Sequence, residues 1–214
     1  MSILYNWKIG GEAGYGIMNT GGPIFAKTLM RVGFFVCIYP EYPSLIRGGH
    51  NTMQVAIARE SITAPYWTID QLVALNTNTI IWHQDELKKE GVLLYDAGAV
   101  KFTNDGTLDT TRIPPLTGTV SVARARASKK IRSDIRAQGI AFEKIAEEVG
   151  GSKVMRNVVA VGAALAIFER SIKTSAQLLP IAQKVLADIF AAKGDVVIKP
   201  NQAVVEAGYK AASL

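Results

Sequence analysis

One short segment combines residues that could bind an anion. It runs EYPSLIRGGHNT from Glu41 to Thr52, and Arg47 is followed at once by Gly48 and Gly49. Because glycines leave the backbone around a guanidinium bare, such an arginine can bind a carboxylate or a phosphate with two parallel hydrogen bonds. The alternative is structural, with Arg47 donating to backbone carbonyls while the glycines supply positive φ angles. The sequence gives these two interpretations equal weight.

A glycine-rich turn precedes that segment, in the stretch GGEAGYG at positions 10–16. Gly11, Gly14 and Gly16 fall between a predicted strand and a predicted helix, where backbone amides can approach an anion at the helix start. Their spacing is GxxGxG, which differs from the GxGxxG of dinucleotide-binding folds. No acidic residue ends the next strand to bind a ribose, so NAD or FAD binding is disfavoured. An anion site and a tight packing turn both stay open.

The elements around these residues predict an α/β fold. We expect a strand over 4–9, a helix over 17–31 whose start is delayed or kinked by Pro23, and a strand over 34–39. The run FFVCIY is continuously apolar, which is typical of a strand covered on both faces in a parallel sheet. A further strand is expected over 52–58. This order predicts a doubly wound, mostly parallel sheet flanked by helices.

The middle of the chain contains shorter predicted elements. A helix with Asp70 as its N-cap is expected over 70–75, followed by strands over 79–82 and 92–95. Asp96 ends the last of these strands. In α/β folds this position carries either a ligand-binding group or a side chain that caps a turn, and the second is commoner.

The C-terminal part is expected to be helical. Helices are predicted over 143–148, 154–168, 175–190 and 200–212. Pro180 lies inside the third of them, so that helix is expected to begin late. We expect one domain over 1–214, with an α/β part over about 1–120 and a more helical part over about 121–214.

The chain is basic, with a formal net charge of +6 and a pI of about 9.4. Much of the excess lies in one stretch, which contains Arg124, Arg126, Lys129, Lys130, Arg132 and Arg136. Aromatic residues are not interleaved with these cations, so no nucleic-acid partner is expected. A solvated helix face is the favoured interpretation, and a patch for a phosphate or a protein partner is the alternative.

Cysteine and histidine content limits the metal chemistry. The single cysteine, Cys37, excludes an internal disulfide, an all-cysteine metal site and a cysteine-ligated cluster. It lies in an apolar run and is expected to be buried and inert. His83 follows Trp82, and the chain has one other histidine. No metal site is therefore expected, and a helix-capping or surface role is favoured for His83.

No stretch of the sequence predicts a membrane partner. The longest apolar run, at 158–168, is about three helical turns long and predicts a core helix. Trp7 and Lys8 interrupt the N-terminal apolar stretch, which therefore lacks the layout of a signal peptide. We expect a cytoplasmic protein.

The segment KIGGEAGYGIMNTGGPIFAKTLMRVGFFVCIYPEYPSLIRGGHNT resembles the gamma component of 2-oxoacid:ferredoxin (or flavodoxin) oxidoreductases. In that family a glycine turn after the first strand is followed by a helix, a strand and a loop that leads into Arg-Gly-Gly. The loop here looks most like the gamma domain that begins the large subunit of the two-subunit enzymes. The segment GGSKVMRNVVAVGAALAIFE resembles the family's asparagine-containing helix, with Asn157 in the matching place.

The resemblance implies a role in a larger enzyme. Such enzymes decarboxylate a 2-oxoacid, for example pyruvate, on thiamine diphosphate with Mg²⁺, pass electrons through 4Fe–4S clusters to ferredoxin, and release an acyl-coenzyme A. Because this chain has no cysteine set and no thiamine diphosphate motif, it is expected to bind none of these cofactors alone and to depend on thiamine diphosphate-binding and iron–sulfur subunits. No catalytic residue is assigned to it.

The resemblance further implies that the gamma component covers the active-site region and helps to bind coenzyme A. The matching positions are Gly11, Gly14, Gly16, Arg47, Gly48 and Gly49. Where the family often has Gly-Gln-Gly, this chain has Tyr15 between two glycines, and its ring could stack on a base or pack on a neighbouring subunit. The alternative function is a free-standing nucleotide- or phosphate-binding α/β module.

Overall fold

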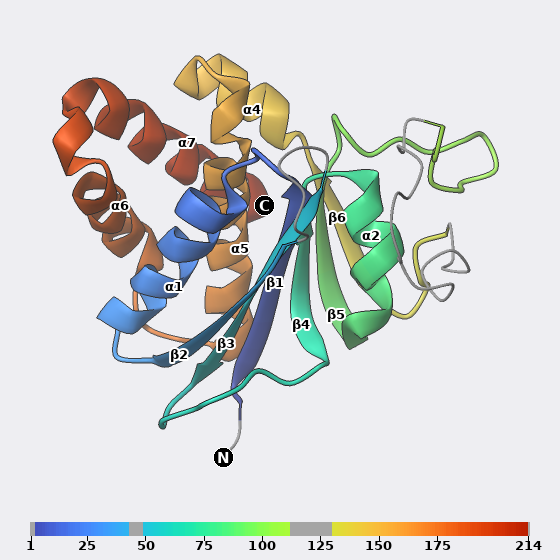
Figure 1. Cartoon of the computed structure of the whole chain (residues 1–214), viewed down its shortest axis with the longest axis horizontal. Helices are drawn as coiled ribbons and strands as arrows, with labels where there is room; N and C mark the ends of the chain where they lie inside the picture. The colour runs from blue at the N-terminus through green and yellow to red at the C-terminus, as the bar shows by residue number, and fades with distance from the viewer. Residues whose placement is uncertain (1–2, 43–48, 112–129, 214) are drawn as a thin grey trace.

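The protein is a mixed β-sheet with helices on both faces (Figure 1). The computed structural model describes residues 3–42, 49–111 and 130–213. The strands are β1 (Tyr5–Glu12), β2 (Phe35–Glu41), β3 (His50–Ala58), β4 (Ile69–Ala74), β5 (Leu87–Asp96) and β6 (Arg136–Ile140). Their order is β2-β3-β1-β4-β5-β6. Strands β1, β4, β5 and β6 pair in parallel, whereas β3 is antiparallel to both β1 and β2. The expected α/β class with a helical C-terminal part is confirmed.

Helices follow β1 and β4, whereas β2, β3 and β4 follow one another directly, and helices dominate the C-terminal part. They are η1 (a π-helix, Ile17–Gly21), α1 (Gly22–Arg31), α2 (Thr77–His83), η2 (Gln84–Glu86), α4 (Phe142–Gly150), η3 (Lys153–Met155), α5 (Arg156–Ile172), α6 (Leu178–Ile189), η4 (Ala191–Lys193) and α7 (Asp195–Ser213). Pro23 lies in the first turn of α1 and Pro180 in the first turn of α6, so both prolines mark late helix starts.

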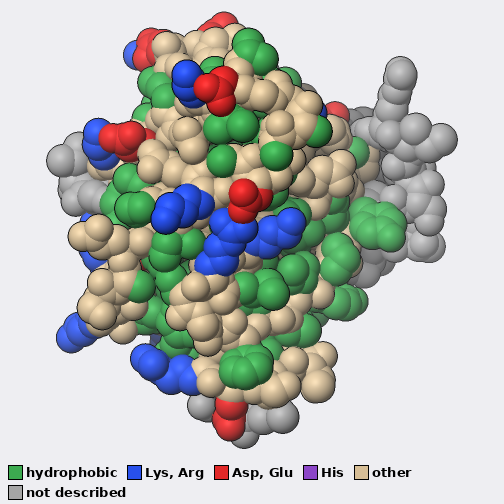
Figure 2. Space-filling view, turned by 90° about the vertical axis from the view of Figure 1, so that its left-hand side faces the viewer, with side chains coloured by type: hydrophobic (Ala, Val, Ile, Leu, Met, Phe, Trp, Pro, Cys, Tyr) green, Lys and Arg blue, Asp and Glu red, His purple; other side chains and the backbone are tan. Residues whose placement is uncertain are grey.

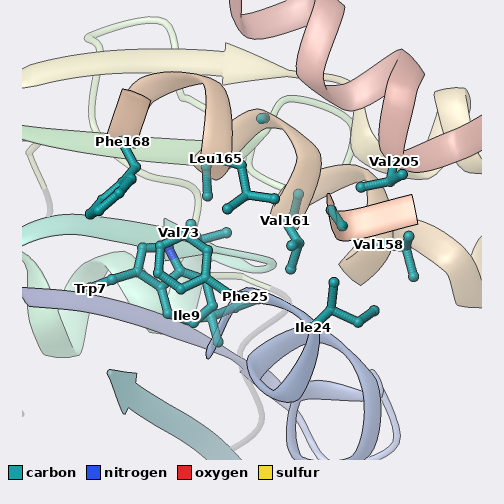
Figure 3. Packing of buried hydrophobic residues seen from close by; sticks show 14 of the residues in the cluster. Trp7, Ile9, Ile24, Phe25, Val73, Val158, Val161, Leu165, Phe168 and Val205 are labelled. Atoms are coloured by element: carbon teal, nitrogen blue, oxygen red, sulfur yellow. The ribbon is translucent and has the colours of Figure 1, made fainter. Parts of the chain in front are cut away.

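The larger core lies between the sheet and the layer formed by α1, α5 and α6. Trp7 of β1 stacks on Phe25 of α1, with ring centroids 4.1 Å apart, and Phe168 of α5 meets Phe25 edge-on (Figure 3). Every residue from Asn157 to Phe168 is buried. An α-helix is buried all round only when other elements cover it on every side. Helix α5 is therefore the central helix of the protein, with the sheet on one side and α7 on the other (Figure 1).

Small residues bring α5 and α7 close together. A Cβ added at Gly162 of α5 would clash with the carbonyl oxygen of Val205, and one added at Gly208 of α7 would clash with that of Val159. The two glycines therefore let the helix backbones touch.

On the outer face of the α6–α7 side, Lys and Arg side chains lie beside Asp and Glu (Figure 2).

Two predicted elements between 70 and 82 are wrong in type. Residues predicted to form a helix from Asp70 belong to strand β4, and those predicted to form a strand at 79–82 belong to helix α2. An apolar run this short fits a doubly buried strand as well as a helix. The helix start is set by Asn76, whose side chain accepts a hydrogen bond from the Thr79 amide at 3.1 Å.

Strand β2 is an edge strand and none of its residues is buried, so the prediction that it is covered on both faces is wrong. Phe35 and Tyr39 are each 50% exposed, and Cys37 between them is partly exposed instead of buried. Pro40 lies within the strand, which is tolerated because an edge strand has one side without ladder partners.

The basic stretch is not a helix face where it is described. Arg136 begins strand β6, which the sequence did not predict. Arg132 forms an ion pair with Asp134 at 2.8 Å and donates to the carbonyls of Gln84 and Leu87. Arg132 therefore links the segment before β6 to the residues that follow α2. The positions Arg124, Arg126 and Lys129 lie outside the described residues.

No helix in the described part of the chain combines the length and the apolar content that a bilayer crossing requires.

Candidate functional site

The glycine turn and the described end of the arginine loop lie together at one edge of the sheet. Strands β1 and β2 both run antiparallel to β3, so their carboxyl ends lie at the same edge as the start of β3. The pairings Glu12 with His50 and Glu41 with Thr52 fix this register. Because β4 and β5 are parallel to β1, their carboxyl ends lie there too. In α/β sheets ligands bind outside the carboxyl ends of the strands.

The glycine turn and the arginine loop are joined directly. The amide of Ala13 in the turn donates to the carbonyl of Gly49 at 2.8 Å. Gly11 lies opposite Asn51 in the β1–β3 ladder. Arg47 and Gly48 lie outside the described residues, so the structure places only the last of the three predicted loop residues. That residue lies beside the turn.

The turn needs glycines for backbone reasons. Gly14 and Gly16 have φ angles of +98° and +73°, which side-chain-bearing residues rarely adopt. A Cβ at Gly11 would lie 3.0 Å from the Leu75 Cβ, and one at Gly16 would clash with the side-chain amide of Asn157. These contacts support the tight packing turn. The anion-binding role of the three glycines stays a prediction.

Tyr15 contacts a cation of its own chain. The guanidinium of Arg156, at the start of α5, lies 4.5 Å from the centroid of the Tyr15 ring, which is a cation–π contact. Arg156 also forms an ion pair with Glu143 at 2.8 Å, and Lys153 binds the same carboxylate at 2.9 Å. Burial raises the pKa of Tyr15, so its hydroxyl stays protonated and can donate a hydrogen bond. Arg156 thus places one cation, at the start of α5, against the Tyr15 ring of the turn.

Asp96 caps a turn, which is the commoner of the two roles expected for it. One carboxylate oxygen accepts from the Gly98 amide at 2.9 Å, and the other accepts from the Glu143 amide, near the start of α4, at 3.2 Å. Burial raises the pKa of Asp96 despite these two hydrogen bonds. Its side chain therefore connects β5 to α4.

His83 is buried and its side chain forms no capping hydrogen bond at the start of η2, so the expected surface or capping role is wrong. Its Nε2 lies 3.1 Å from Nε2 of His50, and its Nδ1 lies 2.7 Å from an oxygen of Glu86. The ammonium of Lys8 lies 2.6 Å from the other oxygen of Glu86 and 3.4 Å from Glu41. These five side chains come from β1, β2, β3, α2 and η2. We call them the histidine–lysine cluster.

The cluster holds Glu86 in its charged form. Burial acts to raise the pKa of this carboxyl, but the hydrogen bond from His83 and the charge of Lys8 outweigh it, and the pKa is lowered. The sequence contained one signal of this arrangement. Lys8 lies in the middle of an apolar strand that is buried along seven of its eight residues, and a buried ammonium requires a partner.

Among the residues that the structure describes, no group of three or more histidine, cysteine or acidic side chains is arranged to hold a metal ion.

The sheet topology and the residues at the carboxyl ends of its strands define a mixed-sheet α/β domain. Its glycine turn lies at a candidate ligand-binding site. The chain belongs to the pyruvate ferredoxin/flavodoxin oxidoreductase family, whose family model matches residues 6–211. It is 31% identical over 91 residues to the 2-oxoacid:ferredoxin oxidoreductase subunit alpha of Sulfolobus sp.. That match covers 42% of this chain and 14% of the relative, so the chain spans much less than the full length of that protein.

Solved structures share the fold. A 2-oxoglutarate:ferredoxin oxidoreductase from Magnetococcus marinus superimposes with a TM-score of 0.73 and 23% identity, over 99% of this chain and 31% of that chain. The gamma subunit of a keto/oxoacid ferredoxin oxidoreductase from Geobacter sulfurreducens has a TM-score of 0.67 and 20% identity, over 97% of this chain and 98% of that chain. Both likenesses establish the architecture of this chain.

Proposed function

We propose that this chain is the gamma component of a cytoplasmic 2-oxoacid:ferredoxin oxidoreductase, which decarboxylates a 2-oxoacid, forms an acyl-coenzyme A and passes electrons to ferredoxin. The chain covers the active-site region and helps to bind coenzyme A. Family membership and the gamma-subunit fold of the Geobacter protein support this assignment. The partner subunits bind thiamine diphosphate with Mg²⁺ and the 4Fe–4S clusters, because one cysteine cannot ligate a cluster.

The observation that carries the proposal is the hydrogen bond from Ala13 to Gly49. It brings the glycine turn and the end of the Arg-Gly-Gly loop to one sheet edge. Coenzyme A is rich in phosphate, and a guanidinium with bare flanking backbone binds phosphate bidentately. The sequence places Arg47 two residues before Gly49. The Magnetococcus structure, which shares the fold, contains bound coenzyme A and succinyl-CoA.

Substitution of Arg47 tests the binding role in the assembled enzyme. Arg47→Ala is expected to raise the apparent KM for coenzyme A about tenfold, because it removes a charge-assisted contact, while the subunits still assemble. Arg59→Ala is the matched control, since Arg59 is exposed just beyond the opposite end of β3. An unchanged KM with intact assembly would refute the coenzyme A contact.

Calorimetry on the isolated chain separates this proposal from a free-standing nucleotide-binding module. A subunit that completes a shared site is expected to bind nicotinamide nucleotides at best very weakly when alone. Micromolar binding of NAD by the lone chain, or its turnover of a 2-oxoacid with coenzyme A and a dye, would contradict the proposal and favour an independent module.

A further inference from the structure

Strand β2 presents apolar side chains at one edge of the sheet (Figure 1). Phe35 and Tyr39 are each 50% exposed, Ile38 is 43% exposed, and the run FVCIYP carries no charge. An exposed apolar edge strand is a template for pairing with another strand, because its outer amides and carbonyls have no neighbouring strand. The function proposed above makes no use of this edge.

The opposite edge strand, β6, has features that resist such pairing. It is five residues long, begins with the charged Arg136 and contains Gly139, which has no side chain to pack. Short and charged edge strands are typical protection against pairing with other chains. Strand β2 is longer and has no charge before Glu41. The fold therefore protects one edge of the sheet and leaves the other able to pair.

Two hydrogen bonds between β1 and β3 determine how the β3 backbone is oriented. The carbonyl of Ile57 accepts a hydrogen bond from the Leu4 amide at 2.8 Å. The carbonyl of Gly49 accepts one from the Ala13 amide, also at 2.8 Å. Successive residues of an antiparallel strand bond to opposite neighbours. The odd-numbered residues of β3 therefore bond to β1, and the even-numbered residues bond to β2.

The register of the β2–β3 ladder then orients the β2 backbone. Cys37 pairs with Ala56, an even-numbered residue, so the odd-numbered residues of β2 bond to β3. The amides and carbonyls of Val36 and Ile38 therefore point away from the sheet. Pro40 occupies the next outward position, where the ladder does not need the amide that proline lacks. Strand β2 thus offers two residues with both a donor and an acceptor to a neighbouring strand.

We propose that β2 pairs with β2 of a second copy of this chain, antiparallel and about a two-fold axis at Cys37. In this register Val36 of one copy exchanges two hydrogen bonds with Ile38 of the other, and the symmetry repeats the exchange across the axis. The two mixed sheets join into one continuous sheet. This pairing does not depend on the function proposed above.

Pro40 favours this register over the adjacent one. With the axis moved by one residue to Ile38, Val36 would lie opposite Pro40 of the second copy, and its carbonyl would face a residue that has no amide. The same move would place the Phe35 ring opposite the carboxylate of Glu41. Both mismatches disappear when the axis lies at Cys37.

Side chains of like character meet across the axis at Cys37. Phe35 lies opposite Tyr39 of the second copy, and aromatic pairs in this position stabilise antiparallel strands. Cys37 lies opposite Cys37 of the second copy. These are non-hydrogen-bonded positions, where the Cα atoms approach to about 4.5 Å. Each chain has a net charge of +6, but the paired run FVCIYP brings no like charges together.

The exposed area predicts a weak and reversible dimer. A large aromatic side chain buries about 150–250 Å², so the half-exposed Phe35 and Tyr39 supply about 100 Å² each. Ile38 and the flanking exposed residues Met30 and Tyr42 bring the total to about half of the roughly 800 Å² per partner of a stable interface. We therefore expect dissociation at micromolar concentrations or above, and a covalent trap is the suitable test.

Oxidation of the full chain with diamide tests the pairing, because Cys37 is the only cysteine. A Cα separation of about 4.5 Å lies in the range in which disulfides form, so a Cys37–Cys37 dimer should appear on a non-reducing gel. Its yield should rise with chain concentration. Absence of this dimer at every concentration would overturn the proposal. Protection of Cys37 only after thiamine diphosphate and iron–sulfur subunits are added would assign the edge to them and overturn it as well.

Relocated cysteines test the register. Phe35→Cys and Tyr39→Cys, each in a Cys37→Ser chain, should form a disulfide when the two variants are mixed, because these positions lie opposite each other. Either variant alone should not, since its two cysteines lie four residues apart along the paired strands, about 14 Å. Equal yields from the mixture and from the single variants would indicate random collisions and would overturn the proposal.

A charge on the outer edge gives a test that keeps Cys37. Ile38→Lys places two ammonium groups near the axis, so it should lower the disulfide yield at least about tenfold, and its exposed position leaves the monomer folded. Val149→Lys is the matched control, because Val149 is 45% exposed on α4, which follows β6 at the opposite edge. The control should give the wild-type yield. Equal yields from the two lysine variants would overturn the pairing through β2.

Discussion

The side-chain amide of Asn157, at the start of α5, occupies the space that a Cβ at Gly16 would fill. Gly16 is also the N-cap residue of the π-helix η1, with a φ of +73°. Asn157 is 2% exposed. The glycine turn and the central helix are therefore fitted to each other, and this contact fixes the turn at the sheet edge.

Alanine at Gly16 is expected to destabilise the protein by about 3 kcal/mol, because it adds backbone strain and displaces a buried amide. Gly14→Ala is the matched control. Its φ is +98° but no atom lies within 4 Å of the added Cβ, so it should cost only the strain, about 1 kcal/mol. Urea unfolding of both variants measures the difference. Equal losses would mean that the Asn157 contact adds nothing.

Alanine at Gly208 is expected to destabilise the protein by about 3 kcal/mol. In an exposed helix the same change stabilises by about 0.5–1 kcal/mol, so the sign of the effect is diagnostic. Here the added Cβ would clash with the backbone of α5 at Val159. Thermal or urea unfolding checks this, with the exposed Lys210→Ala on the same helix as a control that should cost about 0.5 kcal/mol. A stabilised Gly208→Ala chain would show that α5 and α7 do not touch there.

The cation–π contact between Tyr15 and Arg156 predicts an energetic coupling. A double-mutant cycle of Tyr15→Leu and Arg156→Ala should give about 0.5–1 kcal/mol, because the two groups lie 4.5 Å apart. The control cycle pairs Tyr15→Leu with Lys153→Ala, which removes a nearby cation that binds Glu143 instead. Coupling of the same size in both cycles would indicate a general effect of charge and not the ring contact.

The lowered pKa of Glu86 predicts how its contribution to stability depends on pH. Its folded-state pKa lies below the ordinary value of 4.5, so the charged carboxylate stabilises the fold above that pH, and the contribution is lost as pH falls through the folded-state pKa. Glu86→Gln should therefore cost about 3 kcal/mol near pH 7, and the gap to wild type should narrow below about pH 4.5.

Unfolding at several pH values between 3 and 7 checks this difference, and Glu148→Gln should show a small gap at every pH. A Glu86→Gln gap that widens as the solution is acidified would contradict the assigned direction of the pKa shift.

Much of the fold could be predicted from short local patterns in the sequence. The glycine turn after an apolar strand, the prolines at helix starts and the long apolar run of α5 each specify their element within a few neighbouring residues. The family resemblance implies a coenzyme A-binding role for both the glycine turn and the arginine loop, which stays a prediction, and Gly49 lies beside the turn.

Elements that depend on distant partners could not be predicted in this way. The short apolar runs of β4 and α2 fit either element, and their type is decided by the sheet that they join. The partners in the histidine–lysine cluster are likewise far apart in the chain, since Lys8 and Glu86 are separated by 78 positions and His50 and His83 by 33. Only the folded sheet brings them together.

The most direct test of the proposed function is an add-back experiment with the thiamine diphosphate and iron–sulfur subunits from the native source. Formation of acyl-coenzyme A from a 2-oxoacid, with reduction of ferredoxin, is measured with and without this chain. We predict that the partners alone form little acyl-coenzyme A and that the purified chain restores it in proportion to the amount that assembles. Full activity of the partners without this chain, or no co-assembly with them, would contradict the account.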